Sequence, residues 1–306
     1  MRFAQKSVKV RGHNRLLILK KSPVSKLRMR RLRISAISYL NTAPLMWDFE
    51  HGRAGREFEI SYTVPSSCAQ ALAEGTADIG IIPAAAYAQI PGLQVLPDVA
   101  IASRRAVRSI LLVSQIPLEL VRTVALDTSS MTSVALTKIL FEKWMGGGRT
   151  FTPMEPDIEK MLNECDAGLL IGDPALRVDR LRYHTVDLAE EWIRHTGKPF
   201  VFAFWAVREA ALREADPTLD VATVFRESRD HGLMPGNLDQ ISREWAPRVG
   251  LSEAAVLTYL TECIHYHLDP GCLEGLGLFY RYAADLDLLP TPPELRFVQT
   301  SSAFAD

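Results

Sequence analysis

The hydrophobic pattern of the chain switches repeatedly between short apolar runs and segments with helical spacing. From residue 32 onward, strand-like runs alternate with segments whose apolar side chains recur every three or four positions. This alternation predicts an α/β fold with largely parallel sheets. Strands are expected at 32–37, 58–64, 78–82, 109–113, 121–126, 167–171 and 200–207. Helices are expected at 45–49, 65–74, 132–144, 188–194, 211–215, 221–230, 238–245 and 253–267.

Two successive α/β units, followed by a mostly helical part, predict two lobes with a cleft between them. The apolar runs 109–113 and 200–207 bracket the second unit, and each is interpreted as a hinge strand that crosses between the lobes. The predicted organisation is a basic extension at 1–30, the first part of lobe 1 at 31–108, lobe 2 at 109–205 with hinge strands at its ends, and a mainly helical return to lobe 1 at 206–306.

Charge is distributed unevenly along the chain. The formal net charge is −1 over 306 residues, yet residues 1–33 hold twelve Lys or Arg and no acidic residue. The remainder therefore carries 23 basic against 36 acidic residues, a net charge of −13. Three interpretations of the basic segment stay open: binding to nucleic acid or an anionic membrane, a targeting sequence, and a disordered extension. The last is favoured because charge runs are usually solvated.

Composition narrows the class of protein. A hydrophobic content of 47% with 23% charged residues is typical of a globular protein with a sizeable core. No apolar stretch approaches the roughly 20 residues that span a bilayer. The four cysteines show no Cys-x-x-Cys spacing, so we expect no zinc site and no redox pair, and we expect a cytoplasmic location.

The first candidate site is a polar turn at 38–45, between the strand at 32–37 and the helix at 45–49. Such a turn presents unpaired N–H groups and the positive end of a helix dipole, which together favour an anion. Asn41 or Thr42 is expected to be the N-cap, with Pro44 in the first turn. From these residues alone, a simple capped helix start is the favoured interpretation.

The second candidate site is the polar turn 127–133, which precedes the helix at 132–144. It contains five hydroxyl side chains in seven positions, more than one N-cap requires. If the hinge assignment holds, the two turns face each other across the cleft and would bind a small dicarboxylate. Arg104, Arg105 and Arg108 could add charge-assisted pairing, or simply be solvated.

Four blocks of sequence resemble a known family. They are Ser38-Tyr39-Leu40-Asn41-Thr42-x-Pro44-Leu45, Asp127-x-Ser129-Ser130-x-Thr132-Ser133, Asp166-Ala167-x-Leu169-Leu170-Ile171-Gly172-Asp173, and Trp192-x-x-x-Thr196-Gly197-x-Pro199-Phe200-Val201-Phe202-Ala203-x-Trp205. From about residue 33 to the end, the chain resembles the MqnA family, the chorismate dehydratases of the futalosine route to menaquinone. One departure is that Ala84 follows Pro83 where the family commonly has a serine.

The resemblance implies a type-2 periplasmic-binding-protein fold used by a cytoplasmic lyase without cofactor or metal. Its partner would be chorismate, with no nucleic acid or membrane, and a homodimer is possible. It implies Asn41 and Ser109 as catalytic residues. The substrate-binding residues that follow from it and from the two turns are Ser38, Tyr39, Thr42, Pro83, Arg108, Thr128, Ser129, Ser130, Thr132, Ser133, Gly172, Asp173 and Phe202.

A side-chain base for the implied reaction is hard to identify. His184 and His195 are interpreted as surface or packing residues, and His265 and His267 should face different sides of a helix. Asp173 is better placed, but it would serve equally well as a helix N-cap. This leads to the hypothesis that the enolpyruvyl carboxylate of the substrate itself removes the C3 proton, with Asn41 and Ser109 positioning the reacting groups.

Two other functions are conceivable for a chain of this fold. A solute-binding protein would work outside the cytoplasm and needs an export signal, which the sequence lacks in recognisable form. The sibling lyase that forms 1,4-dihydroxy-6-naphthoate would be expected to carry a histidine base in lobe 2. No histidine lies between Val107 and Tyr183, so the dehydratase is the favoured prediction.

Overall fold

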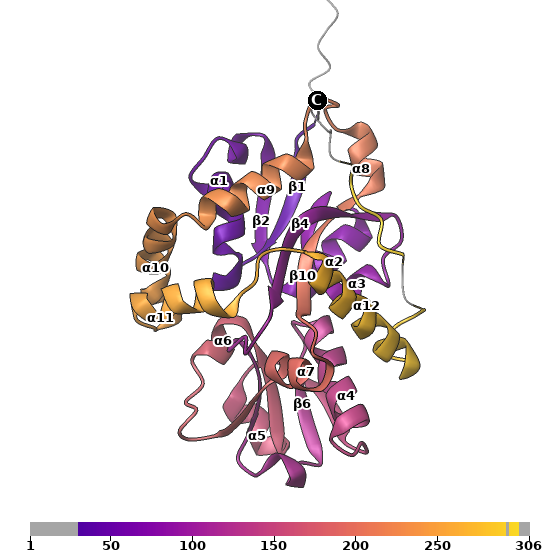
Figure 1. Cartoon of the computed structure of the whole chain (residues 1–306), viewed down its shortest axis with the longest axis vertical. Helices are drawn as coiled ribbons and strands as arrows, with labels where there is room; N and C mark the ends of the chain where they lie inside the picture. The colour runs from indigo at the N-terminus through magenta and orange to yellow at the C-terminus, as the bar shows by residue number, and fades with distance from the viewer. Residues whose placement is uncertain (1–29, 292–293, 300–306) are drawn as a thin grey trace, which may run out of the picture.

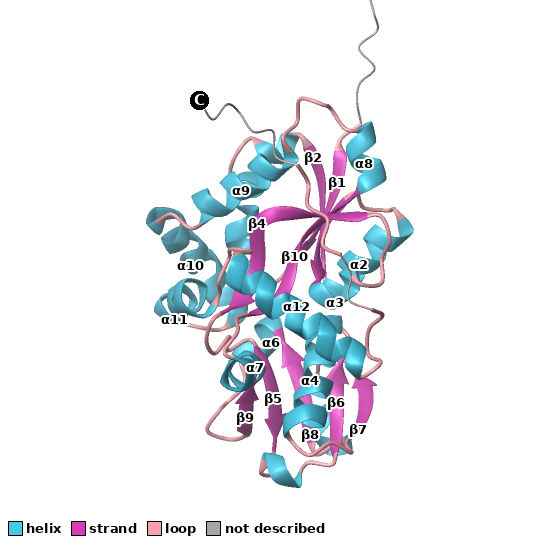
Figure 2. Cartoon of the chain, turned by 45° about the vertical axis from the view of Figure 1, so that its right-hand side comes forward, coloured by secondary structure: helices cyan, strands magenta, loops and turns pink. Residues whose placement is uncertain are grey.

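Two lobes, each built around a five-stranded sheet, make up the protein (Figures 1 and 2). The computed structural model describes residues 30–291 and 294–299. The predicted basic extension therefore lies outside the described residues, apart from Arg30. The lobes and the helical C-terminal part confirm the predicted fold class.

Lobe 1 contains the sheet β2-β1-β3-β10-β4. Its strands are β1 (Leu32–Ile37), β2 (Phe58–Thr63), β3 (Ile79–Pro83), β4 (Leu93–Ser103) and β10 (Phe200–Arg208). The segments between them form η1 (Leu40–Met46), α1 (Trp47–Glu50), η2 (Ala54–Arg56), α2 (Pro65–Glu74) and α3 (Ala84–Tyr87). All five residues of β3 are buried, because helices cover one face of the sheet and neighbouring elements the other.

Lobe 2 contains the sheet β7-β6-β8-β5-β9. Its strands are β5 (Ile110–Ser114), β6 (Thr123–Asp127), β7 (Thr150–Met154), β8 (Ala167–Ile171) and β9 (His184–Asp187). The connections form η3 (Leu118–Leu120), α4 (Met131–Trp144), α5 (Ile158–Glu164), α6 (Gly172–Leu176) and α7 (Leu188–Thr196).

The two sheets share one topology. The fourth position is filled by the antiparallel strand that follows a crossing: β5 after the first crossing and β10 after the second. The prediction of largely parallel sheets is therefore too simple. The predicted strand 200–207 is present, but it pairs with β3 and β4 in lobe 1, so a lobe 2 that extends to residue 205 includes residues of the wrong sheet.

After β10 the chain continues in lobe 1 as helices, which lie beside its sheet and over the junction of the lobes (Figure 1). They are α8 (Glu209–Glu214), α9 (Val221–Gly232), α10 (Pro235–Val249), α11 (Glu253–Thr258), the π-helix η4 (Tyr259–Cys263) and α12 (Pro270–Asp285). The predicted helix 253–267 ends early, because His265 forms an antiparallel bridge with Ala102 of β4. Among the described helices, none is long and apolar enough to cross a membrane.

Candidate active site between the lobes

An inner cavity lies where the two sheets meet end to end. Parallel strands of both lobes finish there, and the antiparallel strands β5 and β10 begin there, so strand ends supply most of its wall. The residues that line it are Ile37, Tyr39, Asn41, Pro65, Pro83, Ile101, Ile110, Ser130, Ser133, Ile171, Gly172, Phe202 and Ala203. Seven predicted site residues are thus brought together: Tyr39, Asn41, Pro83, Ser130, Ser133, Gly172 and Phe202.

Lobe 1 contributes the start of η1. The prediction that Asn41 or Thr42 is the N-cap is wrong: Tyr39 takes that position, and its side chain makes no capping hydrogen bond. The buried Thr42 hydroxyl donates to Asn41 Oδ1 at 3.3 Å. This bond orients the Asn41 amide so that its NH₂ group remains available as a donor toward the cavity.

The missing cap comes from the other lobe. Asp173 Oδ1 accepts a hydrogen bond from the Leu40 N–H at 3.0 Å. The prediction that Asp173 caps its own helix is wrong, because Ile171 is the N-cap of α6 and the Asp173 carboxylate caps η1 across the cleft. Its predicted binding of substrate stays a prediction. Burial raises the pKa of Asp173, while the Leu40 N–H and Arg177 oppose that shift.

Gly172 and Tyr39 form a second contact between the lobes. Gly172 has φ +62°, and a Cβ built on it would lie 2.6 Å from Tyr39 Cδ2. Glycine is therefore required at position 172 for two reasons: the positive φ, and the aromatic ring that packs directly against its Cα. Together the Tyr39–Gly172 and Leu40–Asp173 contacts, here called the latch, lie directly beside Asn41.

The hydroxyls of the second polar turn divide into two groups. Ser130 is the N-cap of α4: its Oγ accepts from the Ser133 N–H at 3.2 Å and donates to Ser133 Oγ at 2.9 Å. These two serines line the cavity at the start of a 14-residue helix, a position that favours an anion.

The remaining hydroxyl residues of that turn do not line the cavity. Thr132 Oγ1 accepts from the Ala85 N–H of lobe 1 at 3.0 Å, and the Ser129 carbonyl accepts from the Ser66 N–H of lobe 1 at 3.0 Å. These bonds hold the lobes together. Thr128 is exposed. In the first polar turn, Ser38 and Thr42 likewise do not line the inner cavity; they line a neighbouring outer pocket.

The buried Asp127 carboxylate organises the same turn. It accepts hydrogen bonds from the N–H and hydroxyl of Ser129 at 2.8 and 2.5 Å and from the Ile171 N–H at 3.3 Å. Burial raises the pKa of Asp127, and these donors counter the shift. Asp127 is thus a structural group that fixes the turn between β6 and α4.

Ser109 lies in the first crossing, beneath the cavity. Its Oγ accepts from the Tyr259 hydroxyl at 2.8 Å, and its carbonyl accepts from the Gly172 N–H at 2.7 Å. It is 1% exposed and is absent from the cavity wall, which its neighbour Ile110 lines. Tyr259 was not singled out from the sequence, because nothing in its local pattern shows that a π-helix would bring it to Ser109.

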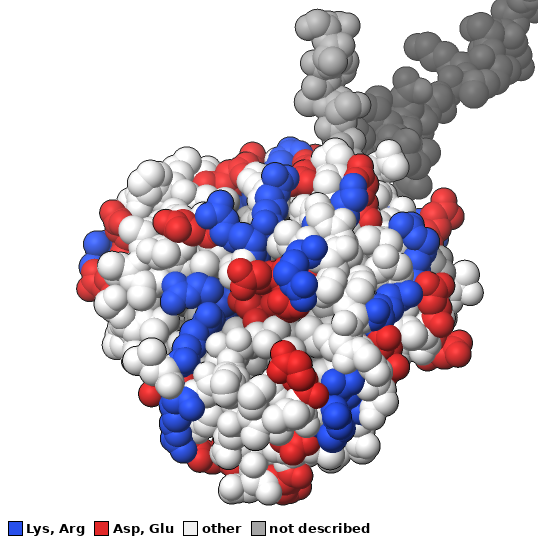
Figure 3. Space-filling view, turned by 60° about the horizontal axis from the view of Figure 1, so that its bottom comes forward, with Lys and Arg blue, Asp and Glu red and all other residues white. Residues whose placement is uncertain are grey.

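The predicted arginines do not reach the inner cavity. Arg108 is exposed with φ +64°, and its backbone N–H donates to Asp187 Oδ2 at 2.6 Å. Arg104 pairs with Asp269 at 2.5 Å on the lobe 1 side of the crossing. On the face of the molecule in Figure 3, Lys and Arg alternate with Asp and Glu, so this face is not a uniformly basic surface.

The apolar side of the cavity is formed by Pro83, Phe202 and four isoleucines. Phe202 packs edge-on against Phe200 at 4.7 Å between ring centroids. The isoleucines at 37, 101, 110 and 171 were not predicted as site residues, although each stands at a strand end that faces the cleft. No local sequence pattern marks these isoleucines as site residues, because their position at the cleft depends on the strand order.

The cavity is narrow because the lobes are closed on each other. Its volume is about 40 Å³, room for little more than a few water molecules. The Ser66–Ser129, Ala85–Thr132 and Leu40–Asp173 hydrogen bonds all cross the cleft. A ring-shaped acid can enter only if these bonds open and the lobes part at the two crossings.

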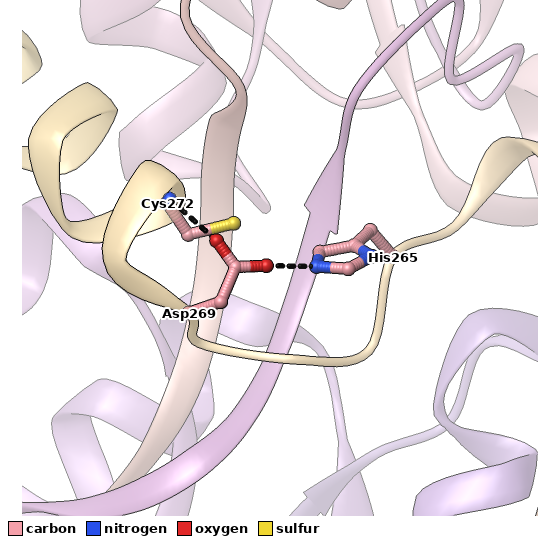
Figure 4. A group of neighbouring side chains, drawn as sticks. All are labelled: His265, Asp269 and Cys272. Carbon is pink, nitrogen blue, oxygen red and sulfur yellow. Dashed lines mark hydrogen bonds and ion pairs between the residues drawn. The ribbon is translucent and has the colours of Figure 1, made fainter.

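One cluster outside the cavity has side chains that often bind metals: His265, Asp269 and Cys272, whose donor atoms lie within 4.8 Å of one another (Figure 4). The Asp269 carboxylate is already used, since Oδ1 caps α12 through the Cys272 N–H at 3.0 Å and Oδ2 lies 2.5 Å from both His265 Nε2 and Arg104. Burial raises the pKa of the Cys272 thiol to about 12. The nearby Arg104 guanidinium and the neutral Cys272 thiol both disfavour a metal ion here. The cluster is better described as a structural ion pair between Arg104 and Asp269.

Comparison with known proteins identifies the family. The family model described as menaquinone biosynthesis matches residues 32–285. The chain belongs to this family. It is also 30% identical over 259 residues to the chorismate dehydratase of Thermus thermophilus, covering 79% of this chain and 91% of that protein. The family resemblance drawn from the four sequence blocks is thereby confirmed.

Solved structures confirm the periplasmic-binding-protein-like fold. An Archaeoglobus fulgidus protein superposes with a TM-score of 0.67 at 18% identity, covering 85% of this chain and 98% of that one. The aliphatic sulphonate binding protein SsuA of Escherichia coli gives 0.62 at 16% identity, covering 90% and 94%. At these identities the likeness concerns the fold alone.

Proposed function

We propose that this family member dehydrates chorismate to 3-[(1-carboxyvinyl)oxy]benzoate for menaquinone synthesis by the futalosine route. The family match and the Thermus relative support the reaction. The structural observation that carries the proposal is the pairing of Asn41 from lobe 1 with Ser130 and Ser133 at the α4 N-terminus of lobe 2 in one cavity. Such a pair suits a small acid with two carboxylates.

The reaction removes the C3 proton and the C4 hydroxyl of the substrate, and the ring becomes aromatic. Charge develops on the ring carboxylate as the C3 proton leaves, because the carbanion is delocalised through the C1=C2 bond. Catalysis therefore requires donors aimed at that carboxylate and tight orientation of the ring. The Asn41 NH₂ group, or the Ser130–Ser133 pair at the α4 N-terminus, supplies donors of this kind.

We assign the proton abstraction to the enolpyruvyl carboxylate of the substrate. Among the residues that line the inner cavity, Tyr39 is the single titratable one, and burial raises its pKa above the usual tyrosine range. It is therefore a poor base at neutral pH. The Asp173 carboxylate accepts a hydrogen bond from the Leu40 N–H, and neither His184 nor His195 lines the cavity. The sibling lyase, with its expected histidine base, is correspondingly disfavoured.

In this mechanism Asn41 is a catalytic residue and Pro83 and Phe202 hold the ring. We also propose that Ser109 lies beside the reacting groups, where the Tyr259 hydroxyl holds its side chain in place. Its hydroxyl would reach the substrate once the lobes part and reclose around the ring. Ser38, Thr42, Arg108, Thr128, Ser129, Thr132 and Asp173 are now proposed to support the cavity rather than to touch substrate.

The decisive experiment incubates the purified protein with chorismate. We expect an aromatic absorption band to appear together with a product lighter by one water in mass spectra, and an added chelator to leave the rate unchanged. Chorismate recovered intact, with tight binding but no turnover, would instead support a solute-binding role of the kind that the SsuA-like fold permits.

Location and assembly stay predictions. All four cysteines are free, which suits the reducing cytoplasm that we propose for the enzyme. The possible homodimer is checked by light scattering of the eluting protein, where a mass near 68 kDa, about twice the 34.1 kDa chain, would support it.

A further inference from the structure

A second, larger pocket adjoins the inner cavity. It has a volume of about 380 Å³ and shares Ile37 and Tyr39 with the inner cavity. Residues of η1, α1, β2 and α10 form it on the lobe 1 side, and Asp173 closes it from lobe 2. The ring of Tyr39 therefore stands between the two spaces.

The polar groups of this outer pocket differ in what they already bind. The Glu50 carboxylate accepts from the Tyr62 hydroxyl, and Asp173 accepts from the Leu40 N–H. The Arg248 guanidinium instead lies over the Trp245 ring, 5.2 Å from its centroid. Within residues 30–291 and 294–299, no carboxylate oxygen lies within 4.0 Å of it. Among the described residues, the Arg248 guanidinium thus has no hydrogen-bond acceptor.

We infer that the outer pocket binds an aromatic carboxylic acid, with Arg248 on the carboxylate and Trp245, Tyr62 and Tyr39 against the ring. Arginine pairs with carboxylates through two parallel N–H donors, and aromatic faces favour a flat ring. The inference rests on the proposed function for its biological ligand, because the product of that reaction is an aromatic dicarboxylate. The pocket is an outer subsite that holds this product as it leaves.

The position of the subsite links its occupant to lobe movement. Tyr39 and Asp173 belong both to the outer pocket and to the latch. An acid seated between Arg248 and Tyr39 contacts the same side chains that must separate before the inner cavity opens. Product retained there would compete with the entry of new substrate.

The binding test uses 3-(carboxymethoxy)benzoate, which carries the two acid groups of the product without its vinyl group. We expect this probe to quench tryptophan fluorescence, and we expect Trp245→Phe to remove most of the change. Arg248→Gln should weaken binding about fivefold, the size of an exposed ion pair, and Arg248→Lys less. Arg243→Gln is the matched control, since Arg243 is exposed on the same helix and lines neither pocket.

Kinetics with chorismate then separates the two proposals. Arg248→Gln should weaken inhibition by the product about fivefold while kcat changes little. If Arg248→Gln behaves like Arg243→Gln in both assays, the subsite is refuted even when turnover of chorismate is normal. If the probe binds through Arg248 but chorismate is never converted, the subsite stands and the proposed reaction fails.

Discussion

At the scale of single residues, the site depends on neighbours that fix a few groups in place. Asn41 is held by Thr42, Ser130 by Ser133, and Ser109 by Tyr259. Each bond restricts the rotation of a side chain whose orientation cannot be predicted from the sequence. Precise orientation of this kind is what catalysis by positioning requires.

Asn41→Ala tests the most important of these groups. Because its amide is proposed to stabilise charge that develops during the reaction, we expect kcat to fall about 100-fold or more, with KM changed only a few-fold. Steady-state kinetics with chorismate gives both constants. Equal losses in substrate binding and in turnover would show that Asn41 merely binds the ground state.

Gly172→Ala tests the contact between Tyr39 and the second lobe. The added Cβ meets the Tyr39 ring at 2.6 Å, so we expect the lobes to close incompletely and kcat/KM to fall about tenfold or more. Gly197→Ala is the matched control, because Gly197 has a similar φ of +66° and a Cβ added there would meet no atom within 4 Å. Similar activity in the two variants would show that backbone conformation, not the ring contact, matters.

At the scale of elements, local patterns located most of the structure. The predicted helix 65–74 and strand 167–171 have the observed bounds, since Pro65 starts α2, Gly75 ends it with φ +73°, and β8 is a buried apolar run. The strands β4, β7 and β9 and the helices α5 and α12 were not predicted. β4 is interrupted by Pro97 and by Asp98 with φ +64°, and β7 is a half-exposed edge strand, so neither shows a clear period.

The element η1 is capped by a residue 133 positions away, and Asp173→Ala tests this cap. Loss of the acceptor for the Leu40 N–H should loosen the turn that carries Asn41, so we expect kcat to fall about tenfold and KM to change less. Asp173→Asn keeps an acceptor oxygen and should recover most of the activity. An Asn variant as impaired as the Ala variant would indicate that the negative charge itself is needed.

At the scale of the whole molecule, the fold is two copies of one topology joined by two chain crossings. β5 and β10 are interior strands in the fourth position of their sheets, and each follows directly after the chain has crossed from the other lobe. Two chain crossings between the lobes suit a hinge, and the Leu40–Asp173 and Ser66–Ser129 hydrogen bonds lie where the lobes meet.

The stability of the whole molecule should depend on pH through the buried carboxylate of Asp78. This buried carboxylate accepts from the Arg33 N–H at 2.9 Å and pairs with the Arg33 and Arg30 guanidiniums at the start of β1. These donors hold the pKa of Asp78 well below its usual range, although burial opposes them. A lowered pKa in the folded state stabilises the protein above about pH 4, and this stabilisation is lost as pH falls further.

Asp78→Asn should therefore lower the free energy of unfolding by about 2 kcal/mol at pH 7, a value reduced for the partial exposure of both arginines. The difference from the native chain should shrink as pH falls from 4 toward 2, which urea titrations at each pH would measure. A difference that stays constant over this range would exclude ionisation of Asp78 as its cause.

The sequence by itself determined the alternation of strands and helices, the two polar turns and the family, because apolar periodicity, capping residues and motif spacing are local properties. Tertiary structure decided the rest. It placed the strand Phe200–Arg208 in lobe 1, bonded Thr132 and the Ser129 carbonyl to the other lobe, and made Asp173 the cap of a distant helix. These outcomes depend on which strand ends meet across the cleft, and no local pattern records that.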